Sequence, residues 1–181
     1  MRLVILDRDG VINQDSEAYI KSPDEWIPIP GSLEAIADLT RAGYEVVVAS
    51  NQSGVGRGLF DLAALERIHV KMLDAVADKG GRIAGIFFCP HHPDDRCDCR
   101  KPKPGLFRQI SSRFETALNG VPAIGDSLRD ILAARAVGAR PILVRTGNGA
   151  ETEAGLDRPV TIEVYPDLAA AAKQLIGENA P

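Results

Sequence analysis

The chain has 181 residues, 45% of them hydrophobic, and a formal net charge of −4 at neutral pH. This length and composition are typical of one globular domain, which we expect to span residues 1–181. The acidic balance and the lack of any Lys/Arg run argue against a nucleic-acid partner or an anionic-membrane surface. No apolar run approaches the roughly 18 residues of a membrane-spanning helix. The N-terminus carries no targeting pattern, and we expect a cytoplasmic protein and a monomer.

Strand and helix patterns alternate along the chain. In chain order, the expected elements are strand Leu3–Leu6, a helix capped by Ser32 and ended by Gly43, strand Val46–Ala49, a long helix capped by Asp61 and ended by Gly80, strand Ile83–Phe88, a helix over Leu106–Phe114, strand Val121–Ile124, a helix over Leu128–Arg135, strands Ile142–Val144 and Val160–Val164, and a closing helix Asp167–Ile176. Fully apolar strands are typical of a sheet covered on both faces. The alternation predicts the α/β class with a doubly wound, Rossmann-like parallel sheet.

Reactive polar residues follow four of these strands. Asp7 and Asp9 come after the first strand and Ser50 after the second, while Lys101 follows the third and Asp126 the fourth. Because parallel strands end at one edge of a sheet, we expect these side chains to meet. Two carboxylates so close need a cation, and a hard ion with oxygen ligands fits. A nucleophile, an acid–base carboxylate and a fixed cation are what phosphoryl transfer needs.

Each residue alone also has an ordinary structural explanation. Ser50 can cap a turn, Lys101 can be a solvated charge, and Asp126 can be a helix N-cap. Their joint occurrence at successive strand ends favours a common site. The glycine-rich segment Gly54–Gly58 lacks the spacing of a dinucleotide-binding or P-loop motif, so a nucleotide site is not indicated.

All the cysteines of the chain lie in one short segment, with the pattern C-x-H-x5-C-x-C. Three thiolates and one imidazole suit a closed tetrahedral zinc site, with His92 as the alternative to the first histidine. A disulfide is disfavoured by the odd count, and unrelated buried thiols are disfavoured by the clustering. Zinc would order the loop that leads into Arg100 and Lys101. The expected ligands are Cys89, His91, Cys97 and Cys99.

The set Asp7-x-Asp9, Ser50, Lys101-Pro102 and Gly125-Asp126-x-x-x-Asp130 resembles the four motifs of the haloacid dehalogenase superfamily of phosphatases, over roughly residues 1–146. The resemblance implies that Asp7 is the nucleophile that forms an aspartyl-phosphate and that Asp9 is the general acid and base. It implies magnesium held by the Asp7 carboxylate, the Asp9 carbonyl and Asp126. It also implies that Ser50 and Lys101 bind the phosphoryl oxygens, with Asp130 in support.

The segments Asp7–Asn13, Ser50–Gly58 and Cys97–Gly105 resemble one branch of that superfamily. This branch holds heptose bisphosphate phosphatases and histidinol-phosphate phosphatases, and the former are more similar. The resemblance implies a small phosphorylated sugar as substrate, namely D-glycero-D-manno-heptose 1,7-bisphosphate losing its 7-phosphate for ADP-heptose and lipopolysaccharide synthesis. The alternatives are a histidinol-phosphate phosphatase, a polynucleotide 3′-phosphatase-like module and a non-catalytic zinc-stapled binding module.

Substrate contacts follow from the same resemblance. One departure is Ser127, which stands where the heptose enzymes often carry Lys, so Arg129 or Arg57 is expected to replace that contact. Only about twenty residues precede Ser32 after the first motif, and about ten separate Ser50 from Asp61. Segments this short cannot build a second core, which predicts a capless active site. The expected substrate-binding residues are Asp15, Ser16, Tyr19, Asn51, Gln52, Ser53, Arg57 and Arg100.

Overall fold

One parallel sheet forms the centre of the structure, a computed structural model that describes residues 2–156 and 162–178. Its strands are β1 (Arg2–Leu6), β2 (Tyr44–Asn51), β3 (Ile83–Cys89), β4 (Pro122–Gly125), β5 (Arg140–Val144) and β6 (Glu163–Tyr165). Their order is β3-β2-β1-β4-β5-β6, and every neighbouring pair is parallel. The chain order reverses at β1, and ligands of such sheets bind at this switch point. The predicted doubly wound parallel sheet is confirmed.

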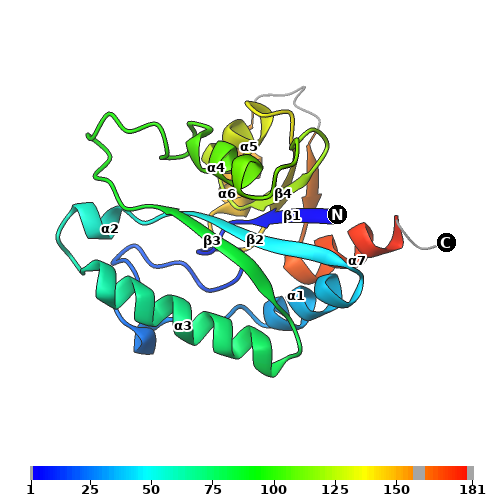
Figure 1. Cartoon of the computed structure of the whole chain (residues 1–181), viewed down its shortest axis with the longest axis horizontal. Coiled ribbons are helices and arrows are strands. Elements are labelled where there is room, and N and C mark those ends of the chain that lie inside the picture. Colours follow the sequence, from blue (N-terminus) through cyan, green and yellow to red (C-terminus); the bar gives the residue numbers. More distant parts are fainter. Residues whose placement is uncertain (1, 157–161, 179–181) are drawn as a thin grey trace.

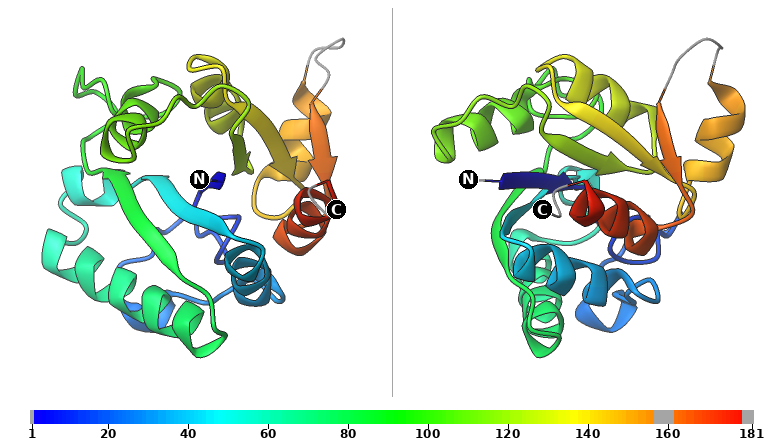
Figure 2. Two further views of the ribbon diagram at one scale, coloured as in Figure 1. Left: turned by 45° about the vertical axis from the view of Figure 1, so that its right-hand side comes forward. Right: turned by 90° about the vertical axis from the view of Figure 1, so that its right-hand side faces the viewer.

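Helices cover both faces of the sheet (Figures 1 and 2). They are η1 (Pro23–Glu25), α1 (Ser32–Arg41), α2 (Ser53–Gly56), α3 (Leu62–Asp78), α4 (Gly105–Arg113), α5 (Leu128–Arg135), α6 (Gly149–Gly155) and α7 (Leu168–Gly177). Helices α1, α3 and α7 pack on one face, and α4 and α5 on the other. None of the helices in the described residues has the length and apolar character needed to cross a bilayer.

Strand β2 shows why the sequence pattern is continuously apolar. Val46 and Val48 pack into the cluster with α1, α3 and α7, whereas Val47 and Ala49 pack into the cluster with α4. Successive strand residues point to opposite faces, so the middle of a strand that is covered on both sides is apolar at every position. Two buried layers therefore hold the carboxyl end of β2, which carries Ser50, in a fixed place.

The predicted helix cap at Asp61 is confirmed, and Asp167, predicted as the first residue of the closing helix, is the N-cap of α7. The Asp61 carboxylate accepts the Ala64 N–H at 2.7 Å, and the Asp167 carboxylate accepts the Ala170 N–H at 2.8 Å. These bonds satisfy donors that the first turn of a helix leaves free. The predicted strand Val160–Val164 is seen as β6 from residue 163 onward, and residues 160 and 161 lie outside the described residues.

The predicted cap at Ser32 is wrong. Gly31 occupies the N-cap position with φ of 82°, and Ser32 is the first residue of α1. The Ser32 hydroxyl instead donates to the Ile12 carbonyl at 2.6 Å, where both groups are buried. The Ile12 carbonyl also accepts the Ile29 N–H at 2.9 Å, so Ser32 adds a second hydrogen bond to this oxygen. The bond ties α1 to the loop that follows β1.

His69 on α3 makes stability depend on pH. It is buried against Phe88, with ring centroids 5.6 Å apart, and burial together with the charge of Arg8 lowers the pKa of His69 to about 4. The unfolded chain takes up the proton near the ordinary pKa of about 6.5, so stability falls as pH falls through the window from 6.5 to 4.

A His69→Phe variant keeps the ring packing without the titration. Between pH 7 and pH 4.5, we expect the parent to lose about 2 kcal/mol more unfolding free energy than this variant does. Urea denaturation at the two pH values measures the difference. Equal losses of unfolding free energy in the parent and in His69→Phe would show that His69 is not the source of this pH dependence.

Candidate active site

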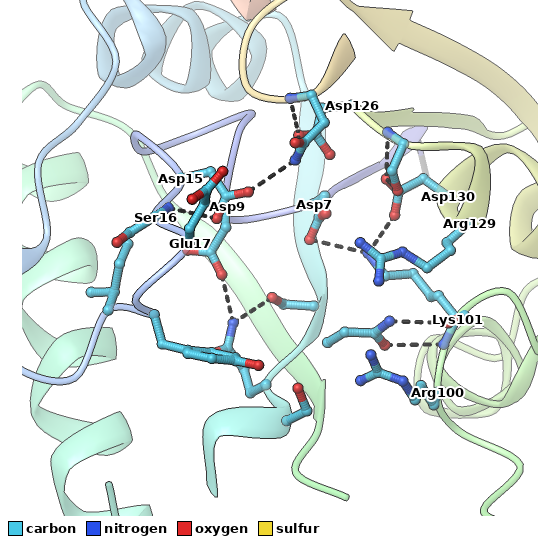
Figure 3. A pocket seen from close by; sticks show the side chains of 18 of the residues that line it. Asp7, Asp9, Asp15, Ser16, Glu17, Arg100, Lys101, Asp126, Arg129 and Asp130 are labelled. Carbon is cyan, nitrogen blue, oxygen red and sulfur yellow. Dashed lines mark hydrogen bonds and ion pairs between the residues drawn. The ribbon is translucent and has the colours of Figure 1, made fainter. Parts of the chain in front are cut away.

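A pocket of about 320 Å³ opens at the carboxyl ends of β1, β2 and β4 (Figure 3). It brings together every residue that the sequence assigned to catalysis, substrate or magnesium: Asp7, Asp9, Asp15, Ser16, Tyr19, Ser50, Asn51, Gln52, Ser53, Arg57, Arg100, Lys101, Asp126 and Asp130. It also includes Asn148, which the sequence did not single out because it belongs to no motif.

Lys101 lies buried between two carboxylates. Its Nζ is 3.0 Å from Asp7 Oδ1 and 2.5 Å from Asp130 Oδ1, and it donates to the Ala49 carbonyl at 2.7 Å. Burial opposes the charge of Lys101, but Asp130 and Asp7 outweigh it and raise the pKa of the lysine. The ammonium group is therefore permanently charged at the floor of the pocket.

The negative charges around Asp7 outweigh the positive charge of Lys101. Burial is the main reason that the pKa of Asp7 is raised to about 8, and Asp130, Asp126 and Asp9 add to it while Lys101 opposes them. Asp7 Oδ1 accepts the Arg8 N–H at 2.7 Å and pairs with Lys101, whereas Oδ2 has no hydrogen-bond or ion-pair partner among the described residues. A divalent cation would relieve the remaining repulsion.

The Asp9 carboxylate is held by four hydrogen bonds. Arg8 donates through Nε at 2.9 Å and Nη2 at 3.0 Å, Asn13 Nδ2 donates at 2.9 Å, and Gln52 Nε2 donates at 2.8 Å. Burial acts to raise the pKa of Asp9, but the Arg8 charge and these bonds lower it overall. Gln52 Nε2 is also 2.7 Å from Ser50 Oγ, so one amide joins the acid–base candidate to the phosphate-binding candidate.

Asn51 fixes the main chain of Lys101. Its Nδ2 donates to the Lys101 carbonyl at 3.0 Å, and its Oδ1 accepts the Lys101 N–H at 3.0 Å. The sequence predicts substrate contacts for Asn51 and Gln52, and in the structure both amides are engaged by neighbouring protein groups. The two residues lie at the wall of the pocket and position the groups beside them.

Asp130 accepts a hydrogen bond from Lys101 and is itself held by Ser127. Its Oδ2 accepts the Ser127 N–H at 3.0 Å and the Ser127 hydroxyl at 2.5 Å, while its Oδ1 faces Lys101. Ser127 is the N-cap of α5, so the alternative explanation of Asp126 as that cap does not hold. Both oxygens of Asp130 are thus occupied by protein donors.

Asp126 Oδ2 sits in a tight enclosure. It accepts the Asn148 N–H at 2.8 Å and Asn148 Nδ2 at 3.1 Å. A Cβ atom would lie 2.1 Å from this oxygen at Gly10 and 2.3 Å at Gly147, and both residues have positive φ. Only glycine fits at these two positions. Burial raises the pKa of Asp126 to about 6, and the bonds from Asn148 oppose it.

Three carboxylates suit a hard cation. Oxygens of Asp7, Asp126 and Asp130 lie within 4.8 Å of one another. Since protein donors occupy both oxygens of Asp130, Asp7 and Asp126 remain available. The oxygen-only donor set and the raised pKa values of both residues fit magnesium.

A second group of possible metal ligands lies in the loop after β3. Ligand atoms of Cys89, His91, Cys97 and Cys99 lie within 4.8 Å of one another. His91 Nδ1 is 3.1 Å from Cys99 Sγ and 3.5 Å from Cys89 Sγ. His92 Nδ1 instead accepts the Asp94 N–H at 3.2 Å. The geometry therefore favours His91 over the alternative His92, and the three cysteines are free thiols.

Loops alone form the rim of the pocket. Between β1 and α1 the only regular element is η1, and between β2 and α3 it is α2, so neither loop carries a cap domain in the described structure. Arg57 lies 6.0 Å from the ring of Tyr19. On the opposite side, Arg100 and Arg129 have no acidic partner among the described residues, and Arg100 Nη1 is buried without a hydrogen bond.

Comparison with known proteins identifies the family. A family model described as HAD-hydrolase-like matches residues 98–171, and one described as polynucleotide kinase 3 phosphatase matches residues 2–127. The D-glycero-beta-D-manno-heptose-1,7-bisphosphate 7-phosphatase of Bordetella bronchiseptica is 58% identical over 178 residues, which cover 98% of this chain and 99% of that protein. The chain belongs to the heptose 1,7-bisphosphate 7-phosphatase family.

Solved structures of this family agree in shape. The crystal structure of D,D-heptose 1,7-bisphosphate phosphatase from B. bronchiseptica, complexed with magnesium and phosphate, has a TM-score of 0.96 at 58% identity and covers 98% of this chain and 99% of that one. The enzyme from Burkholderia thailandensis has a TM-score of 0.78 at 47% identity, covering 97% and 99%. The predicted haloacid dehalogenase resemblance is confirmed, and the heptose branch is favoured over its alternatives.

Proposed function

We propose that this chain removes the 7-phosphate of D-glycero-D-manno-heptose 1,7-bisphosphate, leaving the 1-phosphate, as a step toward ADP-heptose and lipopolysaccharide core precursors. The observation that carries the proposal is the meeting of Asp7, Asp9, Lys101 and Asp126 in one pocket of a chain that matches heptose phosphatases over nearly its whole length. A single-domain, cytoplasmic monomer is part of the proposal, and the three free thiols suit a reducing compartment.

The chemistry follows from the positions of the side chains. Asp7 Oδ2 attacks phosphorus, and the bond from phosphorus to O7 of the sugar breaks. Asp9 gives a proton to that oxygen, and because Arg8 and the neighbouring amides lower its pKa in the free protein, Asp9 must take up this proton when the phosphorylated substrate binds. Asp9 then takes a proton from water, which attacks the aspartyl-phosphate and releases phosphate and free Asp7. Lys101 Nζ and Ser50 Oγ stabilise the phosphoryl oxygens through both steps.

Two metals complete the proposal. The carboxylates of Asp7 and Asp126 and the main-chain carbonyl of Asp9 would hold magnesium, which supplies charge neutralisation between phosphate and Asp7 when bound. The second group, Cys89, His91, Cys97 and Cys99, would hold a structural zinc ion. A bound zinc ion would order the loop that leads to Lys101 and would thereby help to position this lysine in the active site.

The zinc site yields a direct prediction. A Cys97→Ser variant should lose most of its zinc and on the order of 3 kcal/mol of unfolding free energy, because binding energy is folding energy at such sites. Elemental analysis and thermal denaturation measure both effects. A His92→Ala variant is the matched control and should keep its zinc, because His92 faces Asp94. Zinc-free parent protein, purified under reducing conditions, would contradict the assignment.

The rim suits a second anionic group. The Ser127 hydroxyl donates to Asp130 and is not available for substrate, whereas Arg129, in the first turn of α5, is exposed and has no acidic partner among the described residues. Arg100 and Arg129 can meet the distal phosphate with forked hydrogen bonds. Across the pocket from these arginines, Asp15 and Ser16 can bind sugar hydroxyls (Figure 3). Tyr19, Ser53 and Arg57 also line the pocket and can add contacts.

Substrate preference tests the function. We expect kcat/KM for heptose 1,7-bisphosphate to exceed that for histidinol phosphate at least tenfold, about 1.4 kcal/mol of transition-state binding. A 3′-phosphorylated oligonucleotide should be poorer still. Arg100→Ala should lower the ratio of kcat/KM for heptose 1,7-bisphosphate to kcat/KM for histidinol phosphate. Arg108→Ala, which alters an exposed arginine on α4, should leave this ratio unchanged. Equal efficiency on histidinol phosphate would move the chain to the alternative activity.

A further inference from the structure

Asn148 stands at a helix N-cap position without capping the helix. It precedes α6, and its side chain accepts no hydrogen bond from the first turn. Asn is favoured at N-caps because its side-chain oxygen accepts such a bond. Here the side-chain amide nitrogen is directed at two carboxylates instead: Asp126 Oδ2 at 3.1 Å and Asp15 Oδ2 at 2.9 Å.

The bridge joins two parts of the pocket. Ionised carboxylates only accept hydrogen bonds, so the amide NH₂ is the end of Asn148 that can face both. Asp126 is the buried acid at the end of β4, whereas Asp15 is exposed on the segment 14–22, which we call the entrance loop. The amide gives one hydrogen to each acid and separates two like charges without adding a charge of its own.

The same residue fixes the orientation of Asp126. With its main-chain N–H and its side-chain amide both on Oδ2, and with Gly10 and Gly147 closing around that oxygen, the carboxylate cannot turn. Oδ1 is left as the oxygen that can bind a cation. Preorganising one oxygen removes the cost of ordering the ligand when the cation arrives.

We propose that Asn148 is a positioning residue that presents Asp126 as a one-oxygen metal ligand and ties the entrance loop to the metal site. The inference rests on the magnesium site of the proposed function. It adds that metal binding and ordering of the entrance loop are linked through one amide group. Displacement of the loop breaks the bond from Asn148 to Asp15 and loosens the amide that holds Asp126.

The surrounding contacts allow a clean test. Thr152 Oγ1 donates to the Asp126 main-chain carbonyl at 2.9 Å, and Thr146 Oγ1 donates to the Gly10 carbonyl at 2.7 Å. These bonds attach α6 and the segment before it to the residues that follow β4 and β1, independently of the Asn148 side chain, and Asn148 itself is exposed. An Asn148→Ala variant therefore keeps its fold and its main-chain N–H. Thr152→Val is the matched control, because it alters a contact of the same helix to Asp126 that does not touch the carboxylate.

Metal binding is measured directly on zinc-loaded protein by electron paramagnetic resonance with Mn²⁺, an ion that shares the oxygen preference of magnesium. We expect the Mn²⁺ dissociation constant to rise roughly 10- to 100-fold in Asn148→Ala and less than about threefold in Thr152→Val. The magnesium activation curve for turnover should shift by the same factor in Asn148→Ala, with kcat restored at saturating magnesium. A general loss of structure would not be rescued in this way.

Hydrogen exchange tests the link to the entrance loop. Addition of magnesium, with no Mn²⁺ present, should slow amide hydrogen exchange of residues 14–22 in the parent protein. In Asn148→Ala it should leave the exchange rates of these residues unchanged. The inference is overturned if Asn148→Ala binds Mn²⁺ as the parent does, or if Thr152→Val weakens binding equally. A parent protein with no Mn²⁺ site would instead refute the magnesium part of the proposed function.

Discussion

Asp7→Asn should lower turnover by at least roughly 10³-fold, because an amide cannot form the covalent intermediate. The substitution keeps the shape of the side chain and the acceptor for the Arg8 N–H, so the fold should persist. The parent protein should gain one phosphoryl group on Asp7 when the reaction is quenched in acid, as read by peptide mass spectrometry. The variant should gain none.

Two further variants complete this test. Asp9→Asn keeps the nucleophile but lacks the proton donor and base, so with an ester of a good leaving group the phosphorylated Asp7 should accumulate and decay slowly. Asp74→Asn, an exposed aspartate of α3, is the neutral control and should turn over normally. Near-normal activity in Asp7→Asn, or phosphate on another residue, would overturn the assigned nucleophile.

Lys101→Met should lower kcat by at least roughly 10²-fold and reduce unfolding free energy by about 3 kcal/mol. Both effects have one cause. The variant removes the charge that faces the phosphoryl group and leaves Asp7 and Asp130 buried without their cation. Steady-state kinetics and urea denaturation at pH 7 measure the two losses separately.

A second substitution separates the two effects. Adding Asp130→Asn to Lys101→Met removes one of the uncompensated carboxylates, so stability should recover in part while activity stays low. Lys103→Met changes an exposed lysine of the same loop and should leave kcat unchanged. Full recovery of activity in the double variant would show that Lys101 acts only on stability.

The strand pattern was sufficient to predict where the reactive groups meet. Lys101 is distant from Asp7 in sequence, yet both follow parallel strands of one sheet, and the topology of the sheet places Lys101 Nζ 3.0 Å from Asp7 Oδ1. The grouping of His91, rather than His92, with the three cysteines also follows from a local pattern, because all four residues lie within one short loop. Patterns of this kind depend on the backbone alone.

Orientations that depend on a third segment could not be predicted. Ser32 does not cap its helix, because its hydroxyl donates to the Ile12 carbonyl of the loop after β1. Asn51 is directed at the main chain of Lys101 rather than at the cavity. Asn148 has no motif around it, and its importance appears only when Asp15 and Asp126 are seen on either side. Each case is decided by tertiary contacts that a sequence pattern does not encode.

The central position of β1 sets a limit on how the enzyme can mature on the ribosome. Ile5 pairs with Val47 of β2 on one side and with Ala123 of β4 on the other. The pairing of β1 with β4 therefore cannot form until β4 has been synthesised. Contacts of such long sequence separation form slowly, and domains generally complete them only after the distant segment has emerged. A nascent chain can assemble β1, β2 and β3 with α1 and α3 first. Asp7 at the end of β1 then meets Asp126 only when β4 has docked beside it.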